Sequence, residues 1–185
     1  HKKPMKFALN YSRPAAQLLR EGKIEVDLFK CPLIPEIIQE ASGLKPFYVH
    51  FPIQAGQREI KPELVASIRK YLQTSETIFI NAHFSTRFQN VTNPENADEV
   101  VEAALSDINF LAAHFEPGRI IIENIPRCPD NMEVVPLVTS PAVISTLLER
   151  SGCGLLLDIA HARLAAEALG MPVQEYILKL PVDRI

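Results

Sequence analysis

The sequence has 185 residues, of which 47% are apolar and 22% are charged, a composition typical of one packed globular domain. Its net charge of −3 and its pI near 6.0 argue against a nucleic-acid-binding protein. The sequence contains no run of about 18 apolar residues, so it predicts no membrane span. The three cysteines lack Cys-x-x-Cys spacing, which favours reduced, structural thiols and a cytoplasmic setting. Residues 1–4 are interpreted as a tag remnant or a disordered end, because Met5 fits a natural start.

Short apolar runs alternate along the chain with segments of helical periodicity. The apolar runs predict strands at residues 6–10, 24–29, 46–51, 77–83, 119–123 and 154–158, and the start of a seventh strand at 183–185. The periodic segments predict helices at residues 14–20, 35–41, 62–72, 96–115, 140–150, 160–169 and 173–178. Several of these helices begin with proline, which is favoured in the first turn.

Alternating strands and helices imply right-handed crossovers and a parallel sheet. Neither G-x-G-x-x-G nor a P-loop pattern occurs at a strand-to-helix turn, which weakens the case for a nucleotide-binding open sheet. We therefore expect a single TIM-type (β/α) barrel domain over residues 1–185. A complete barrel has about 250 residues, so this one is expected to be incomplete at its C-terminus. An open six-stranded sheet is the alternative.

Metal-ligand side chains stand at the ends of four successive predicted strands. These candidates are His50, His83, Glu123 and Asp158, with His161 three residues further on. The carboxyl ends of parallel barrel strands converge on one face, so we expect the five side chains to share one site. Imidazole and carboxylate together suit Zn²⁺, Mn²⁺ or Fe²⁺ better than Ca²⁺ or Mg²⁺. Two or three ions that share bridging carboxylates are therefore expected.

Each candidate residue also has a purely structural interpretation. Asp158 is a favourable N-cap for the helix that follows it. Glu123 has Arg119 and Arg127 nearby in the sequence as ion-pair partners. Four strands in succession that end in His, Glu or Asp favour the metal site nonetheless, because buried carboxylates and imidazoles are costly without partners. Arg87 is either an anchor for an anionic substrate or a solvated loop residue.

Four sequence stretches carry a resemblance to a known superfamily. YVHFP, NAHFS, IIIENIP and GCGLLLDIAHA resemble segments of the xylose isomerase-like TIM-barrel superfamily. The part from IIIENIP to the C-terminal residue is most similar to the multinuclear non-haem iron-dependent oxidases, and the chain also resembles endonuclease IV-type enzymes.

The resemblance implies roles for the five candidate ligands. His50 and His83 would bind one metal ion, Glu123 would bridge to a second ion that Asp158 also binds, and His161 would bind a third. One departure is that these oxidases often carry Asp-x-x-Asn, whereas this chain carries Asp-x-x-His from Asp158 to His161. The family's remaining ligands would lie beyond Ile185.

The leading functional hypothesis is a metal-dependent enzyme like these oxidases, with iron as the first choice of metal. The resemblance implies that iron and O₂ modify residues of a peptide substrate that a partner protein delivers. The runner-up is a sugar isomerase or epimerase with a small-molecule substrate, in which Glu123 is a ligand or the catalytic base. Two further hypotheses are a zinc-dependent phosphodiesterase of the endonuclease IV type and a degenerate barrel used for binding.

Overall fold

The computed structural model describes residues 5–185, so the interpretation of residues 1–4 lies outside the described part. The chain divides into two compact units. The first unit contains the described residues up to Pro52 and residues 66–80, and the second contains residues 53–65 and 81–185. None of the helices in the described part of the chain combines the length and the apolar character that a membrane span requires.

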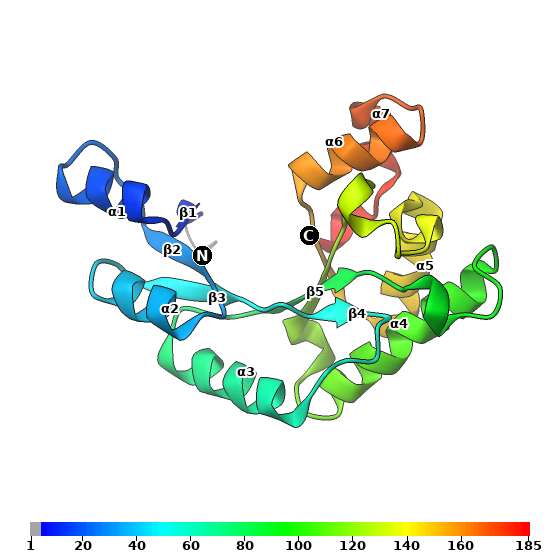
Figure 1. Ribbon diagram of the computed structural model, residues 1–185, viewed down its shortest axis with the longest axis horizontal. Helices are drawn as coiled ribbons and strands as arrows, with labels where there is room; N and C mark the ends of the chain where they lie inside the picture. Colours follow the sequence, from blue (N-terminus) through cyan, green and yellow to red (C-terminus); the bar gives the residue numbers. More distant parts are fainter. Residues whose placement is uncertain (1–4) are drawn as a thin grey trace. The chain divides into compact units, whose positions relative to one another are not determined.

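The first unit is built on a parallel three-stranded sheet in the order β1-β2-β3. Its strands are β1 (Ala8–Asn10), β2 (Leu28–Pro32) and β3 (Phe47–His50). Its helices are α1 (Arg13–Arg20), α2 (Pro35–Ser42) and most of α3 (Pro62–Thr74). In the blue-to-cyan part of Figure 1, the chain passes from β1 through α1 to β2 and from β2 through α2 to β3. Phe29, Cys31 and Val49 lie in the core of this unit, each at most 1% exposed.

The second unit is built on a four-stranded sheet in the order β4-β5-β6-β7. Its strands are β4 (Gln54–Ala55), β5 (Ile80–Phe84, of which Ile80 belongs to the first unit), β6 (Ile120–Glu123) and β7 (Gly154–Leu156). β4 pairs with β5 and β6 pairs with β7, both in parallel. The helices are α4 (Ala97–Ala112), α5 (Pro141–Ser151), α6 (Ile159–Ala168) and α7 (Val173–Lys179). α4 packs on α5, and α6 packs on α7.

Short 3₁₀ helices complete the secondary structure. They are Phe88–Asn90, Pro117–Arg119, Pro129–Asn131, Pro136–Thr139 and Val182–Arg184. The last of these corrects a prediction, because residues 183–185 were expected to start a seventh barrel strand. Leu180 accepts a hydrogen bond from Val182 N and Pro181 accepts one from Arg184 N, so the chain turns here instead of extending.

The prediction of a single TIM-type barrel is wrong. The strands form two separate sheets of three and four strands, whereas a barrel is one continuous sheet. Two local features explain the interruption. Pro52 follows β3 and has no N–H to donate, so it cannot extend a ladder. Residues 76–77 run beside β3, but Val49 N donates to the Thr77 side-chain hydroxyl at 2.9 Å, so a hydroxyl stands where a strand would offer a carbonyl.

One strand is displaced from its predicted position, and another was not predicted. β2 lies at Leu28–Pro32 instead of 24–29, because its register is set by pairing of Leu28 with Ala8 and of Phe29 with Phe47. β4 was not predicted at all. It begins two residues after Pro52 and continues an alternation in which Phe51, Ile53 and Ala55 are each at most 1% exposed.

Candidate metal centre

Four of the five predicted ligands lie in the second unit. His83 belongs to β5, Glu123 is the last residue of β6, Asp158 precedes α6, and His161 lies in the first turn of α6. The fifth, His50, is the half-buried last residue of β3 in the first unit, where it pairs in register with Pro32. The assignment of His50 as a ligand stays a prediction.

Glu123 is the centre of the group in the second unit. Its side chain is buried, with 2% of the residue exposed. Its two carboxylate oxygens face two different imidazole rings. Oε2 lies 3.2 Å from His83 Nε2, and Oε1 lies 3.6 Å from His161 Nδ1. The Glu123 carboxylate therefore lies between two of the predicted metal-binding side chains.

The orientation of the His83 ring is set by Ile53, the residue before β4. His83 Nδ1 lies 3.2 Å from the Ile53 carbonyl oxygen and 3.3 Å from Gln54 Nε2. A proton on Nδ1, donated to the carbonyl, leaves the lone pair on Nε2, the nitrogen that faces Glu123, and the Gln54 amide nitrogen is then a neighbour of the ring and not its hydrogen-bond partner. Metal-binding histidines commonly donate their second N–H to a carbonyl in this way. Gln54 was not recognised from the sequence, although the buried alternation around Pro52 could have indicated its strand.

Asp158 has two roles, one for each carboxylate oxygen. Oδ1 accepts from His161 N at 2.9 Å, so the predicted N-cap of α6 is present. Oδ2 lies 3.7 Å from His161 Nδ1. The capping interpretation and the ligand interpretation are therefore compatible, because capping occupies a single oxygen.

His161 is held between α6 and the residue that follows β6. Its Nδ1 lies 2.9 Å from the carbonyl oxygen of Asn124. A carbonyl oxygen only accepts, so Nδ1 carries the proton and Nε2 keeps the lone pair in the neutral ring. This is again the hydrogen-bond pattern of a metal-binding histidine.

The donor set fits a divalent transition metal. Glu123, Asp158 and His161 each offer one ligand atom, and these atoms lie within 4.8 Å of one another. Ligand bonds of about 2.0–2.2 Å place neighbouring donors on one ion about 3–3.5 Å apart, and ions that share a carboxylate lie about 3.5–4 Å apart. Carboxylate and imidazole donors suit iron, zinc or manganese. These residues could therefore hold a metal ion.

The basic residues around this centre have other partners. Arg87 Nη1 bonds Glu59 Oε1 at 2.8 Å. Arg119 pairs with Glu116 at 3.8 Å, and Arg127 Nη1 donates to the Val134 carbonyl at 2.7 Å.

The cysteines are free thiols, as expected from their spacing. Burial raises the pKa of Cys31 to about 11 and also raises the pKa of Cys153. Both thiols are therefore poor nucleophiles, because the thiolate is the reactive form.

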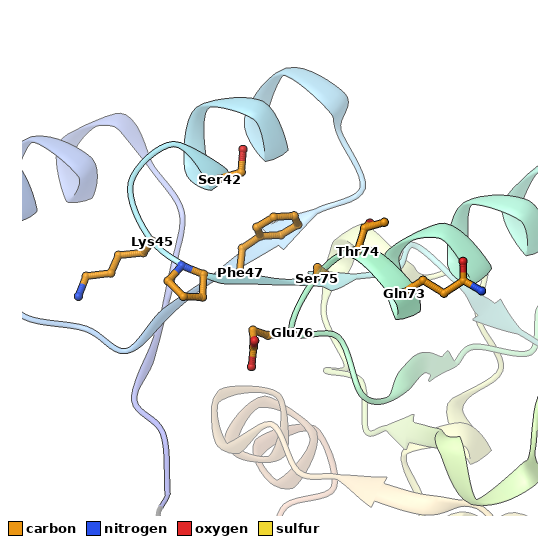
Figure 2. A pocket seen from close by; sticks show the side chains of 8 residues that line it. Ser42, Lys45, Phe47, Gln73, Thr74, Ser75 and Glu76 are labelled. Atoms are coloured by element: carbon orange, nitrogen blue, oxygen red, sulfur yellow. The ribbon is translucent and has the colours of Figure 1, made fainter.

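A separate hollow occurs in the first unit, between the ends of α2 and α3 (Figure 2). The Phe47 ring lies on its wall, and Glu76 on its rim pairs with Lys6 at 2.9 Å. Its lining, as far as the structure describes it, contains neither histidine nor cysteine. Its residues are Ser42, Lys45, Pro46, Phe47, Gln73, Thr74, Ser75 and Glu76.

Comparisons with known proteins give this chain no family. No protein-family model matches the sequence, and no curated protein matches it.

Proposed function

We propose that this chain is a metal-dependent enzyme whose centre is formed by Glu123, Asp158, His161 and His83. The observation that carries the proposal is the buried Glu123 carboxylate, which lies 3.2 Å from His83 Nε2 and offers a ligand atom within 4.8 Å of ligand atoms of Asp158 and His161. Two imidazoles around a buried carboxylate are costly to assemble unless a cation or proton joins them. Glu123, His83, Asp158 and His161 are the residues that would hold two divalent ions.

The proposed reaction is the oxidation of a residue in a peptide substrate, with iron as the resident metal. This reaction comes from the resemblance of IIIENIP and GCGLLLDIAHA to the multinuclear non-haem iron oxidases. Bound iron would supply the one-electron and O₂ chemistry that side chains alone lack. The contribution of the protein is to fix the ligands. The Ile53 carbonyl orients His83, the Asn124 carbonyl orients His161, and the N-cap bond holds Asp158.

A sugar isomerase is the second candidate, and the position of Glu123 favours it. Its buried carboxylate lies within 3.6 Å of two ring nitrogens, so it could accept a proton from a substrate and return it. In this reaction the metal would orient and polarise the substrate without a change in its oxidation state.

Metal analysis of anaerobically purified protein tests the proposal. We expect bound iron in the wild type and its loss in His161→Gln, because an amide is a weak ligand for such ions. His114→Gln is the matched control, since His114 lies on the exposed surface next to Phe110, outside the ligand group. Zinc in place of iron would redirect the proposal to the phosphodiesterase, and manganese in place of iron would redirect it to the isomerase. A wild type without bound metal after supply of all three ions would refute it.

A further inference from the structure

Asn124 connects three parts of the candidate metal centre. It directly follows Glu123 and is 1% exposed. Its side-chain Nδ2 donates to the Asp158 carbonyl oxygen at 2.9 Å, and its Oδ1 accepts from Asp158 N at 2.8 Å. Its own carbonyl oxygen accepts from His161 Nδ1 at 2.9 Å. The same residue is therefore bonded to the backbone of one candidate ligand and to the ring of another.

The side chain of Asn124 continues the hydrogen bonding of the β6–β7 ladder beyond its last backbone pair. The β6–β7 ladder ends where Glu123 pairs with Leu156. One step further, a carboxamide offers the donor and acceptor of a peptide group and so pairs with both backbone groups of Asp158. The distance between Glu123 and Asp158 is consequently set by a continuous run of hydrogen bonds, although β7 has already ended.

From this geometry we infer that Asn124 is the positioning residue of the metal centre. It holds Asp158 and His161 at a fixed distance from Glu123, so that these three residues can act together on metal. The inference rests on the proposed function, because it assigns Asn124 a task in that same site. Outer partners of this kind are worth about 10–100-fold in metal affinity.

Asn131 provides a matched control within the same unit. Its amide also forms two bonds to backbone, since Oδ1 accepts from Cys128 N at 3.0 Å and Nδ2 donates to the Pro126 carbonyl. These bonds hold a loop and contact no candidate ligand. Loss of the Asn131 amide should therefore affect stability much as loss of the Asn124 amide does, without an effect on metal binding.

The test is a Co²⁺ titration of the metal-free chain, followed by visible absorption. In the wild type we expect binding steps that include one lost in Asp158→Asn, which identifies the Asp158–His161 side. Asn124→Ala should weaken this step about 10–100-fold and change its absorption spectrum, whereas Asn131→Ala should leave both unchanged. Circular dichroism establishes that each variant is folded.

Asn124→Asp is a second variant of nearly the same shape. It keeps an acceptor for Asp158 N but places an oxygen against the Asp158 carbonyl. Its added negative charge would by itself strengthen cation binding, so a weaker Asp158-dependent step would report lost geometry. If that step is unchanged in both Asn124 variants, the inference about Asn124 is wrong while the metal proposal stands. If the wild type binds no Co²⁺, the proposed function fails, and the role of Asn124 fails with it.

Discussion

Glu123 and Asp107 are both buried carboxylates of the second unit, at 2% and 5% exposure, but their surroundings differ. Asp107 on α4 receives three backbone N–H groups, because Gly56, Gln57 and Arg58 all donate to its Oδ2 at 2.7–3.1 Å. Glu123 faces two imidazole nitrogens instead. Backbone N–H groups satisfy a carboxylate permanently, whereas imidazole nitrogens can also bind a metal ion. A buried acidic side chain can therefore be either a structural hydrogen-bond acceptor, as Asp107 is, or a candidate metal ligand, as Glu123 is. The type of its neighbours distinguishes the two.

The largest expected effect is opposite behaviour of these two carboxylates: substitution of Glu123 should affect metal binding, and substitution of Asp107 should affect stability. Glu123→Gln should lower metal affinity by more than the roughly 100-fold upper range of outer-partner substitutions, with little loss of stability. Asp107→Asn should leave metal content unchanged and lower the free energy of unfolding by about 2–3 kcal/mol, because three bonds to a charged acceptor are weakened. Metal analysis and urea unfolding of both variants measure the two effects. Equal metal loss in both variants would remove the distinction.

Cys31 extends the comparison to a buried group that has neither kind of neighbour to stabilise its charge. Desolvation raises its thiol pKa to about 11, so about one thiol in a thousand is ionised at pH 8. We expect iodoacetamide to modify the half-buried Cys128 at least 100-fold faster than Cys31 in the folded protein. Mass spectrometry over time, with and without urea, measures this ratio. Comparable rates in the absence of urea would contradict the buried position of Cys31.

Tyr176 shows the effect of burial on a group with one neutral hydrogen-bond partner. Its hydroxyl donates to the Thr139 carbonyl at 2.8 Å, and burial raises its pKa to about 12. The unfolded chain loses this proton near pH 10, so the stabilisation is complete below pH 10 and is lost as the pH rises from 10 to 12. The loss should reach about 2–3 kcal/mol. Urea unfolding between pH 8 and 12 measures it, and Tyr176→Phe should lack this step, while losing about 1 kcal/mol at pH 8.

The Asp158 side chain has both kinds of neighbour, a backbone N–H on Oδ1 and an imidazole near Oδ2. Its variants should separate the capping role from the metal-binding role. Asparagine is a good N-cap, so Asp158→Asn should keep the stability of α6 while metal is lost. Asp158→Ala should lose the metal and, in addition, about 1 kcal/mol of stability. Thermal unfolding of the two metal-free variants gives the difference. If the alanine variant is as stable as the asparagine variant, Oδ1 does not contribute the cap.

The sequence was most informative where local chemistry decides the structure. Pro35, Pro62 and Pro141 mark the first residues of α2, α3 and α5, because a missing N–H is tolerated there. The run that ends in Glu123 is a strand as predicted, since a run apolar on both faces suits a buried strand. Glu123, its last residue, consequently lies near Asp158, which follows the neighbouring strand β7.

The errors concern partners that are distant in the sequence. Pairing between strands determines the sheets, and neither Pro52 nor Thr77 indicates by itself that a ladder stops beside it. The roles of Gln54 and Asn124 were missed for a related reason. A carboxamide contacts whatever polar group lies beside it, a ring nitrogen for Gln54 and backbone for Asn124, and that neighbour is known only when the strands are placed. Residue type thus indicated which side chains could bind metal, whereas the pairing of the strands determined which residues orient those side chains.

Because Asp158 both caps α6 and belongs to the proposed metal site, the first turn of α6 should report whether metal is bound. The His161 amide is bonded to Oδ1 of a side chain whose other oxygen faces the proposed ion site. Hydrogen–deuterium exchange of this first turn should therefore slow when the metal-free protein is loaded, because opening the turn would require release of the ion. The first turn of α4, capped by Asn96, should exchange at the same rate in both states. Slower hydrogen–deuterium exchange at the start of α6 would thus detect metal binding even when the substrate is unknown.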